Sequence, residues 1–345
     1  TESVTETALS LPDTLLIAAV DTIGSEFGES PDVFAFIIDA ASTPAGGVAV
    51  LDAGRIELKV FDEQGTILLM PGRQGSGPGE YQMPMGLAVT EYGYVVSDIS
   101  GGKIIRYDST GELIDEITGF FPVPPVRIKG AGERFLAMDF FMDVSDGELP
   151  RASMDFVAFA GDTDPETVFI SFPMDMSGGM VNSEDVPSFD FAAGPGGEAY
   201  LAVLSDSIFH VMGYDANGAE ILEITEEFEK IALTQEELAR EQLSVSLTVT
   251  DGETSLQRER TPRSDSFRQI IQGIGVDEDG RIWVEMGDTG EHYFRIYSPN
   301  GELTAVALVD ESLPSQVEFS ISPGGMLAWD GDPEDWPKVY LLEVL

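Results

Sequence analysis

The sequence predicts an all-β protein folded as one six-bladed β-propeller over residues 1–345. Groups of short apolar strands recur at an interval near fifty residues, and each clear group carries an aromatic residue followed by Asp-x-x-Gly or Ser-x-x-Gly. Repeats of roughly 40 to 50 residues with about four short strands each are typical of propeller blades. The chain is also long and apolar enough for a large core, since 43% of its 345 residues are hydrophobic.

Four clear units set the number of blades, and they lie at 48–69, 94–117, 199–224 and 281–308. Their aligned turn residues are Asp62, Asp108, Asp215 and Ser298. These turns are 46, 107 and 83 residues apart, which correspond to one unit, two units, and one unit plus an insertion. A degenerate fifth unit is therefore predicted at 134–161, and a last unit at 317–345 ends one strand short.

The missing strand of the last unit is predicted in residues 14–24, TLLIAAVDTIG, which have the spacing of an outer strand. Five clear or degenerate units and one unit split between the termini give six blades. Closing the ring in this way hides strand edges that would otherwise pair with other chains.

The glycine-rich stretch 71–84, PGRQGSGPGEYQMP, first suggests a phosphate-binding loop. Such a loop needs a Lys and a hydroxyl residue after its last Gly, at the start of a helix, but Glu80 and Tyr81 follow here. Pro84 and Gly86 then oppose a helix. Residues 20–40 have the same order of parts, so we interpret the stretch as a connector between repeats.

The segment GRQGSGPGEYQMPMGLAV, followed by VVSDISGGKIIRYDSTGEL, resembles the connector and blade of six-bladed propellers of the NHL-like kind. The resemblance is best with the extracytoplasmic bacterial members, and it is strongest at 48–119 and 267–310. It implies the fold and favours an exported protein. It leaves function open, because this architecture is found in binding modules and in several enzymes.

Composition restricts the partners and the location. The formal net charge of −44 argues against nucleic acid and anionic membrane surfaces as partners. It fits solubility in salty surroundings, a basic partner, or divalent cations. Cysteine is absent, and no apolar run is long enough to span a membrane. The first residues lack the order of a signal peptide, which fits a cytosolic protein or a chain whose signal was removed.

Residues 229–266 depart from the repeat and are predicted to form a helix and a hairpin. A short helix is expected in LTQEELAREQ, because Thr234 and Glu237 have the spacing of a capping box. LSVSLTVT then alternates apolar and hydroxyl residues, and Asp251-Gly252 leads into ETSLQRER. This order predicts a β-hairpin.

The hairpin is our candidate partner-binding site, and we call its proposed contact residues the docking arm. An isolated hairpin is marginally stable in water, so its apolar face needs cover. Either the propeller itself supplies that cover, with the arginines paired to local carboxylates, or a partner protein does. The docking arm consists of Leu243, Val245, Leu247, Val249, Arg258, Arg260, Arg263 and Arg268.

Other side chains give no strong signal for chemistry. The two histidines, His210 and His292, are expected to be ordinary strand residues in different blades. Acidic groups beginning at Asp162, Asp277 and Asp330 sit at predicted turns and lack the order of a calcium loop, although Ca²⁺ stays open as a ligand. Met174, Met176 and Met180 could bind Cu(I) but are expected to pack. No catalytic residue and no metal ligand can be assigned.

The sequence therefore predicts a non-catalytic, extracytoplasmic interaction or scaffold subunit without a cofactor. We expect it to dock on other protein subunits, for example those of a membrane complex, without spanning the membrane itself. The alternative is a divalent-metal-dependent propeller hydrolase or lactonase with its site in the central channel. A small-ligand or glycan-binding propeller is a third hypothesis.

Overall fold

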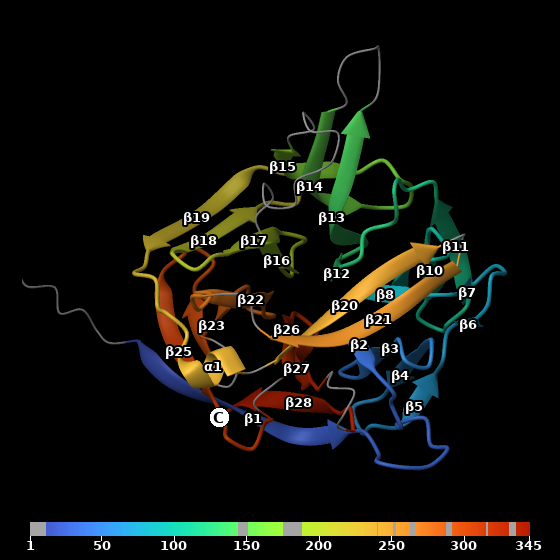
Figure 1. The fold of residues 1–345 in the computed structure, drawn as a ribbon, viewed down its shortest axis with the longest axis horizontal. Coiled ribbons are helices and arrows are strands. Elements are labelled where there is room, and N and C mark those ends of the chain that lie inside the picture. The colour runs from blue at the N-terminus through green and yellow to red at the C-terminus, as the bar shows by residue number, and fades with distance from the viewer. Residues whose placement is uncertain are drawn as a thin grey trace, which may run out of the picture.

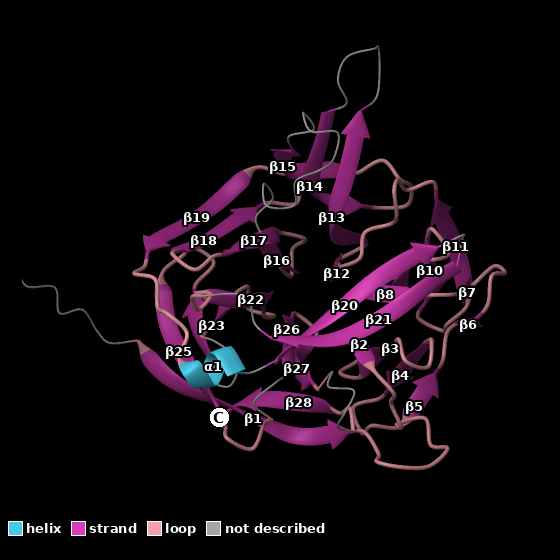
Figure 2. Ribbon diagram, in the orientation of Figure 1, coloured by secondary structure: helices cyan, strands magenta, loops and turns pink. Residues whose placement is uncertain are grey.

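The computed structural model describes residues 12–143, 151–174, 188–239, 241–250, 253–262, 266–287, 292–314, 317–330 and 336–345. In these residues six four-stranded blades form a ring, so the predicted six-bladed β-propeller is confirmed (Figure 1, Figure 2). The blades are numbered along the chain, and each is given below from its inner to its outer strand. Among the described residues, no helix has the length and apolar character needed to cross a membrane.

Blade 1 contains β2 (Ile37–Ser42), β3 (Val48–Asp52), β4 (Glu57–Phe61) and β5 (Ile67–Leu69). Blade 2 contains β8 (Pro84–Thr90), β9 (Gly93–Asp98), β10 (Lys103–Asp108) and β11 (Leu113–Thr118). Blade 3 contains β12 (Ile128–Ala131), β13 (Arg134–Asp143), β14 (Arg151–Phe159) and β15 (Thr167–Met174). Blade 4 contains β16 (Ser188–Ala193), β17 (Ala199–Leu204), β18 (Ile208–Tyr214) and β19 (Glu220–Glu227). Blade 5 contains β22 (Ile271–Val276), β23 (Ile282–Met286), β24 (Tyr293–Tyr297) and β25 (Leu303–Val309). Blade 6 contains β26 (Glu318–Ser322), β27 (Gly325–Trp329), β28 (Val339–Val344) and β1 (Asp13–Ile23).

The ring closes through β1, as the short last repeat predicted. Residues Ile17–Ile23 pair antiparallel with β28 and complete blade 6. The preceding residues, Asp13–Ile17, pair parallel with β25 of blade 5, which the repeat pattern did not predict. One strand thus joins the outer edges of two blades. Ile17 lies where the two pairings meet and is fully buried.

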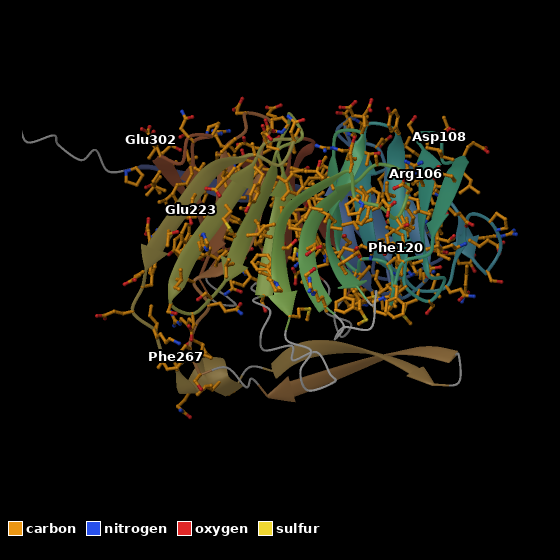
Figure 3. The ribbon with its side chains drawn as sticks, turned by 90° about the horizontal axis from the view of Figure 1, so that it is seen from above. Arg106, Asp108, Phe120, Glu223, Phe267 and Glu302 are labelled. Carbon is orange, nitrogen blue, oxygen red and sulfur yellow. The ribbon has the colours of Figure 1, made fainter. Side chains whose placement is uncertain are left out.

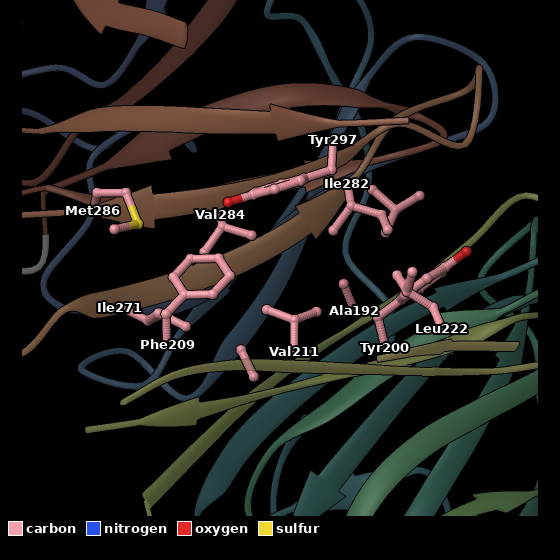
Figure 4. Packing of buried hydrophobic residues seen from close by; sticks show 12 residues of the cluster. Ala192, Tyr200, Phe209, Val211, Leu222, Ile271, Ile282, Val284, Met286 and Tyr297 are labelled. Atoms are coloured by element: carbon pink, nitrogen blue, oxygen red, sulfur yellow. The ribbon is translucent and has the colours of Figure 1, made fainter. Parts of the chain in front are cut away.

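The core consists of six apolar clusters, and each fills the wedge between two neighbouring blades. Figure 4 shows the cluster between blades 4 and 5, where Phe209 lies beside Ile271 and Val284. The second strand of a blade, such as β3, is covered on both faces by neighbouring blades, so its sequence is almost continuously apolar. Outer strands such as β11 are partly exposed and carry more charge.

The glycine-rich stretch is a connector between blades 1 and 2, as predicted. It contains β6 (Arg73–Gln74) and β7 (Glu80–Tyr81), which pair in parallel. The buried Tyr81 hydroxyl donates to the Pro71 carbonyl at 2.5 Å and accepts from the Leu58 amide at 3.2 Å. Gly72 has a φ of 69°, and a Cβ there would lie 2.3 Å from the Tyr107 hydroxyl. The loop is thus organised by its own contacts.

Buried aspartates hold the end of this connector and the corresponding connector before blade 1 in place. Asp98, at the end of β9, accepts hydrogen bonds from the amides of Gln82 (3.0 Å) and Met83 (2.7 Å). Asp52, at the end of β3, accepts in the same way from Ala35 and Phe36, both at 3.0 Å. The repeat therefore fixes the entry to an inner strand with a carboxylate from the neighbouring second strand.

The predicted insertion follows blade 4 and contains α1 (Gln235–Ala239), β20 (Glu241–Thr250) and β21 (Glu253–Pro262). The predicted capping box is confirmed, because the Glu237 carboxylate accepts from the Thr234 amide (2.7 Å) and the Thr234 hydroxyl accepts from the Glu237 amide (3.2 Å). The strands β20 and β21 form a separate two-stranded sheet. Figure 3 shows this ribbon beyond one face of the ring, on the side of Phe267 and opposite to Asp108 and Glu302.

We expect Ile17→Ala to lower the free energy of unfolding by about 2–4 kcal/mol, because it leaves a cavity at the strand that closes the ring. The matched control is Val20→Ala in the same strand, whose side chain is 51% exposed and should change stability by less than about 0.5 kcal/mol. Urea denaturation of the full chain measures both. Equal losses in the two variants would contradict this role of Ile17.

Candidate functional site

Charged side chains from five of the six blades meet along the axis of the ring. Several of their interactions join blades that are not neighbours, such as Lys129 of blade 3 with Asp39 of blade 1. Only side chains near the axis can interact in this way. We call this group the axial cluster; its members are Asp39, Arg127, Lys129, Asp190, Glu285, His292 and Glu318.

Two cations enter the axis from blade 3. The Arg127 guanidinium lies 2.5 Å from an Asp190 carboxylate oxygen, and its other terminal nitrogen is 3.4 Å from the Phe189 carbonyl. Lys129 is held more loosely, with its ammonium 3.4 Å from Asp39. The Arg127 side chain is 52% exposed, so part of the guanidinium stays available to solvent.

The carboxylates of blades 1 and 4 occupy equivalent positions and also hold the ring together. Asp39 pairs with the fourth residue of β3, and Asp190 pairs with the fourth residue of β17. Each accepts a backbone hydrogen bond from the next blade: Asp39 from the Leu87 amide at 3.0 Å, and Asp190 from the Ile274 amide at 2.8 Å. These two aspartates therefore serve the fold as well as the axial cluster.

Blade 5 supplies its carboxylate differently. The residue equivalent to Asp39 and Asp190 is Gly273, which pairs with Glu285, the fourth residue of β23. A Cβ on Gly273 would lie 3.0 Å from Glu285 Oε2 and 3.3 Å from Asp190 Oδ2. The missing side chain thus leaves room for two carboxylates to approach each other. His292 Nδ1 lies 2.5 Å from the other oxygen of Glu285 and orients it.

The cluster perturbs the acidity of its members. Burial raises the pKa of Glu285, against the opposing effect of its hydrogen bond to His292, and Asp190 adds repulsion. The protein atoms around Glu318 keep water away from its carboxylate and raise its pKa, with added repulsion from Glu285, although Arg127 acts in the other direction. The pKa of Arg127 is raised above its usual value, chiefly by Asp190. The carboxylates and cations of the axial cluster therefore interact electrostatically across the axis.

In the described part of the chain, no three His, Asp or Glu side chains are placed so that they could hold a metal ion. Asp39 and Asp190 are close to cations, and Glu285 is paired with His292. The metal-dependent hydrolase hypothesis needs carboxylates or imidazoles that converge on one ion. The arrangement at the axis fits mutual pairing of side chains better than it fits a metal centre.

The structure places the docking-arm residues of the hairpin by their register. Leu243 pairs with Arg260, Val245 with Arg258, and Leu247 with Leu256. Since directly paired residues of antiparallel strands share a face, the apolar positions and both arginines lie on one face of the ribbon. The opposite face carries the alternate positions of β20, from Gln242 to Thr250 in steps of two, and these residues and their partners in β21 are all polar or acidic. The sequence had suggested the apolar face but not that the arginines share it.

Val249 pairs with Thr254 in the same ribbon. Arg268 lies outside the ribbon, at the base of the insertion, where its guanidinium is 2.6 Å from Glu237 and its amide donates to the Ile231 carbonyl at 2.9 Å. It therefore braces the capped helix α1. Arg263 lies outside the described residues, as do the hairpin turn Asp251-Gly252, Met176 and Met180.

The structure places the two histidines and the acidic turn at Asp277 in different surroundings. His210, in β18, lies 3.2 Å from Glu223 on the neighbouring strand, as an ordinary strand residue would. His292 instead belongs to the axial cluster, which the sequence analysis did not anticipate. The Asp277 carboxylate accepts from the amide of Arg281 (2.9 Å) and the indole nitrogen of Trp283 (2.7 Å), so it serves its turn. Calcium binding at the other acidic turns stays a prediction.

Blade 3 contains a pair of carboxylates that the sequence analysis missed. Asp139 of β13 and Asp155 of β14 are directly opposite in the register. Burial, with added repulsion from Asp155, raises the pKa of Asp139 to about 6. One oxygen of Asp155 is buried without a hydrogen-bond partner. The pair could be found only once the strand register was known, because its members are sixteen positions apart in the sequence.

Asp139→Asn should stabilise the protein at pH 7.5 and should stabilise it clearly less at pH 5. The folded state holds the Asp139 proton more tightly than the unfolded chain, so this contribution is complete below the ordinary pKa of 3.8 and is lost as pH rises through about 6. Asp215→Asn should act oppositely, because hydrogen bonds from the Ala219 and Asn217 amides lower the pKa of Asp215. Urea denaturation at both pH values tests this. An Asp139→Asn effect that is equal at the two pH values would contradict it.

Comparisons with known proteins agree with this fold. A family model, DUF5128, described as a 6-bladed beta-propeller, matches residues 42–189. No curated protein matches the chain. Among solved structures, a DUF4221 family member from Bacteroides vulgatus is 10% identical, with 97% of this chain and 98% of that chain covered and a TM-score of 0.49. A putative exported protein from Bacteroides fragilis is 13% identical, with 96% of each chain covered and a TM-score of 0.49.

The calcium-binding protein regucalcin from Agrobacterium tumefaciens is also similar, at 13% identity, with 96% of this chain and 95% of that chain covered and a TM-score of 0.42. At such identities the likeness concerns the fold alone. The NHL-like kind suggested by the sequence therefore stays a prediction. The chain is a six-bladed β-propeller.

Proposed function

We propose that this protein is a non-catalytic interaction subunit that docks on a larger protein assembly through the inserted hairpin. The observation that supports this most directly is the ribbon of β20 and β21, which belongs to no blade sheet and has apolar and basic positions on one face. Blade repeats do not need such an element. Its amphipathic register is typical of a surface that another protein covers.

The insertion is mounted firmly on blade 4. At its start, the Phe228 amide donates to the Ser207 carbonyl, and at its end the Ile270 amide donates to the Ser205 carbonyl, both at 2.8 Å. Lys230 is also 2.8 Å from Asp206 in the same turn. An antiparallel bridge between Ala232 and Phe267 joins the two ends. A mount of this kind would hold the ribbon at a defined place on one face of the ring.

The proposed partner is a protein surface that combines apolar side chains with carboxylates. Leu243, Val245 and Leu247 would be covered by the apolar part, and Arg258 and Arg260 would meet the acidic part. The chain as a whole is strongly acidic, with a formal net charge of −44. A basic patch on such a protein can attach to an acidic partner with a defined orientation, and the attachment should weaken as salt rises.

We also propose that the protein acts outside the cytoplasm and reaches a membrane only through its partner. This part rests on the resemblance of the connector and blade sequence to exported bacterial propellers. Protease accessibility in intact cells of the source organism tests it, with a known cytoplasmic protein as control. Protection of this chain equal to that of the cytoplasmic control would contradict export.

The docking proposal predicts that the wild-type chain migrates in a large complex in gently solubilised source membranes and that high salt releases it. Mass spectrometry of the co-migrating proteins then identifies the partner. Replacing Arg258 and Arg260 by Gln should release the chain at about half the salt concentration needed for wild type or less, because two charge-assisted contacts are removed.

The matched control is the double variant Gln242→Glu with Gln257→Glu. It changes the net charge by the same amount in the same ribbon, but on the opposite face. This control should stay in the complex like wild type. If the hairpin residues 243–260 can be deleted and the complex stays intact, or if both double variants behave alike, the docking arm is not the attachment site.

A further inference from the structure

The charges of the axial cluster are distributed unevenly around the ring. Both cations, Arg127 and Lys129, come from blade 3. Glu318 comes from blade 6, which lies opposite blade 3 in a six-bladed ring, and Glu285 comes from the adjacent blade 5. The axis therefore has a basic wall and an acidic wall that face each other.

The two walls interact without forming a direct ion pair. Glu318 is the first residue of β26, the inner strand of blade 6, and Arg127 and Lys129 both favour its charged form. Among the described residues, however, no salt bridge joins Glu318 to either cation. Although protein atoms surround the Glu318 carboxylate, the residue keeps an exposed surface and has no hydrogen-bond partner in the described part of the chain, whereas Asp39 and Asp190 accept from backbone amides. Its carboxylate is therefore available to a ligand.

Donors are also available on the basic wall. Arg127 uses one terminal nitrogen for Asp190 and the other for a long contact with Phe189, and half of its side chain is exposed. Lys129 has one contact with Asp39 at 3.4 Å, and a quarter of its side chain is exposed. An ammonium carries three donors, so most of its hydrogen-bonding capacity remains. These two residues can bind a carboxylate together.

We propose that the axis of the ring binds a small zwitterion, a molecule with a carboxylate at one end and a primary ammonium at the other. The carboxylate would lie between Arg127 and Lys129, and the ammonium would lie against Glu318.

The charges disfavour simpler ligands. A plain anion would be attracted by two cations but repelled by the four carboxylates of the cluster. A plain cation would be attracted by the carboxylates but repelled by Arg127 and Lys129. A metal ion would need three convergent ligands, which the described residues do not provide. A dipolar molecule is complementary to both walls at once.

A series of ω-amino acids tests the proposal, because its members differ only in the distance between the two charges. Glycine, β-alanine, γ-aminobutyrate and 5-aminovalerate are titrated into the full chain by calorimetry, and thermal unfolding is followed in parallel. We expect at least one of them to bind with a Kd of roughly 1 mM or lower. Butyrate and butylamine, which carry one charge each, should bind at least about tenfold more weakly than that zwitterion.

Glu318→Gln should weaken binding of the best zwitterion by about tenfold or more while the fold is kept, because this side chain supports no other residue. Lys129→Gln should weaken binding of the same zwitterion by a similar factor, because it removes a cation from the basic wall. Glu343→Gln, an exposed Glu in β28 away from the axis, is the matched control and should bind like wild type.

Three results would overturn the proposal. The first is that none of the four zwitterions binds or raises the melting temperature at about 20 mM. The second is that butyrate binds as tightly as the best zwitterion, which would make the axis a plain anion site. The third is that Glu318→Gln and Glu343→Gln bind equally. None of these results depends on the hairpin, so they leave the docking proposal untouched.

Discussion

The structure depends on one constraint: each blade is apolar on both faces, so neighbouring blades must cover it on both sides. Six interblade clusters meet this requirement, and none can be left out without exposing two apolar faces. The ring must therefore close. The strand β1 closes it by pairing with β28 and β25. Residues 13–23 are therefore bound to the two blades that come last along the chain.

A closed ring brings the inner strands of all blades together at one axis, and this has a chemical consequence. The repeat needs apolar residues in the wedges, but it places few demands on the side chains nearest the axis. Asp39 and Asp190 there still serve the fold by accepting backbone hydrogen bonds. Blade 5 has Gly273 at the equivalent position, and Glu285 from the second strand reaches the site instead. The blades therefore differ from one another most clearly in the charged side chains that they place at the axis.

The other departure is the insertion between blades 4 and 5. It emerges at one face of the ring, and its mount at the Ser205–Ser207 turn uses backbone hydrogen bonds and the Lys230–Asp206 pair. In Figure 1 the ribbon of β20 and β21 passes in front of β26, β2 and β8. The proposed docking surface and the axial cluster thus belong to different parts of the chain, the first on an added element and the second on the blades themselves.

The sequence by itself determined the blade count, the closure by the first strand, the capped helix and the hairpin, because these follow from local periodicity and turn chemistry. The repeat spacing, the box of Thr234 and Glu237, and the turn residues all act over a few positions along the chain. Sequence alone did not determine which distant side chains meet. The axial cluster joins residues from Asp39 to Glu318, and the pair of Asp139 and Asp155 depends on strand register. Only the closed ring brings the charges of the axial cluster together, since their proximity results from long-range packing that no local pattern encodes.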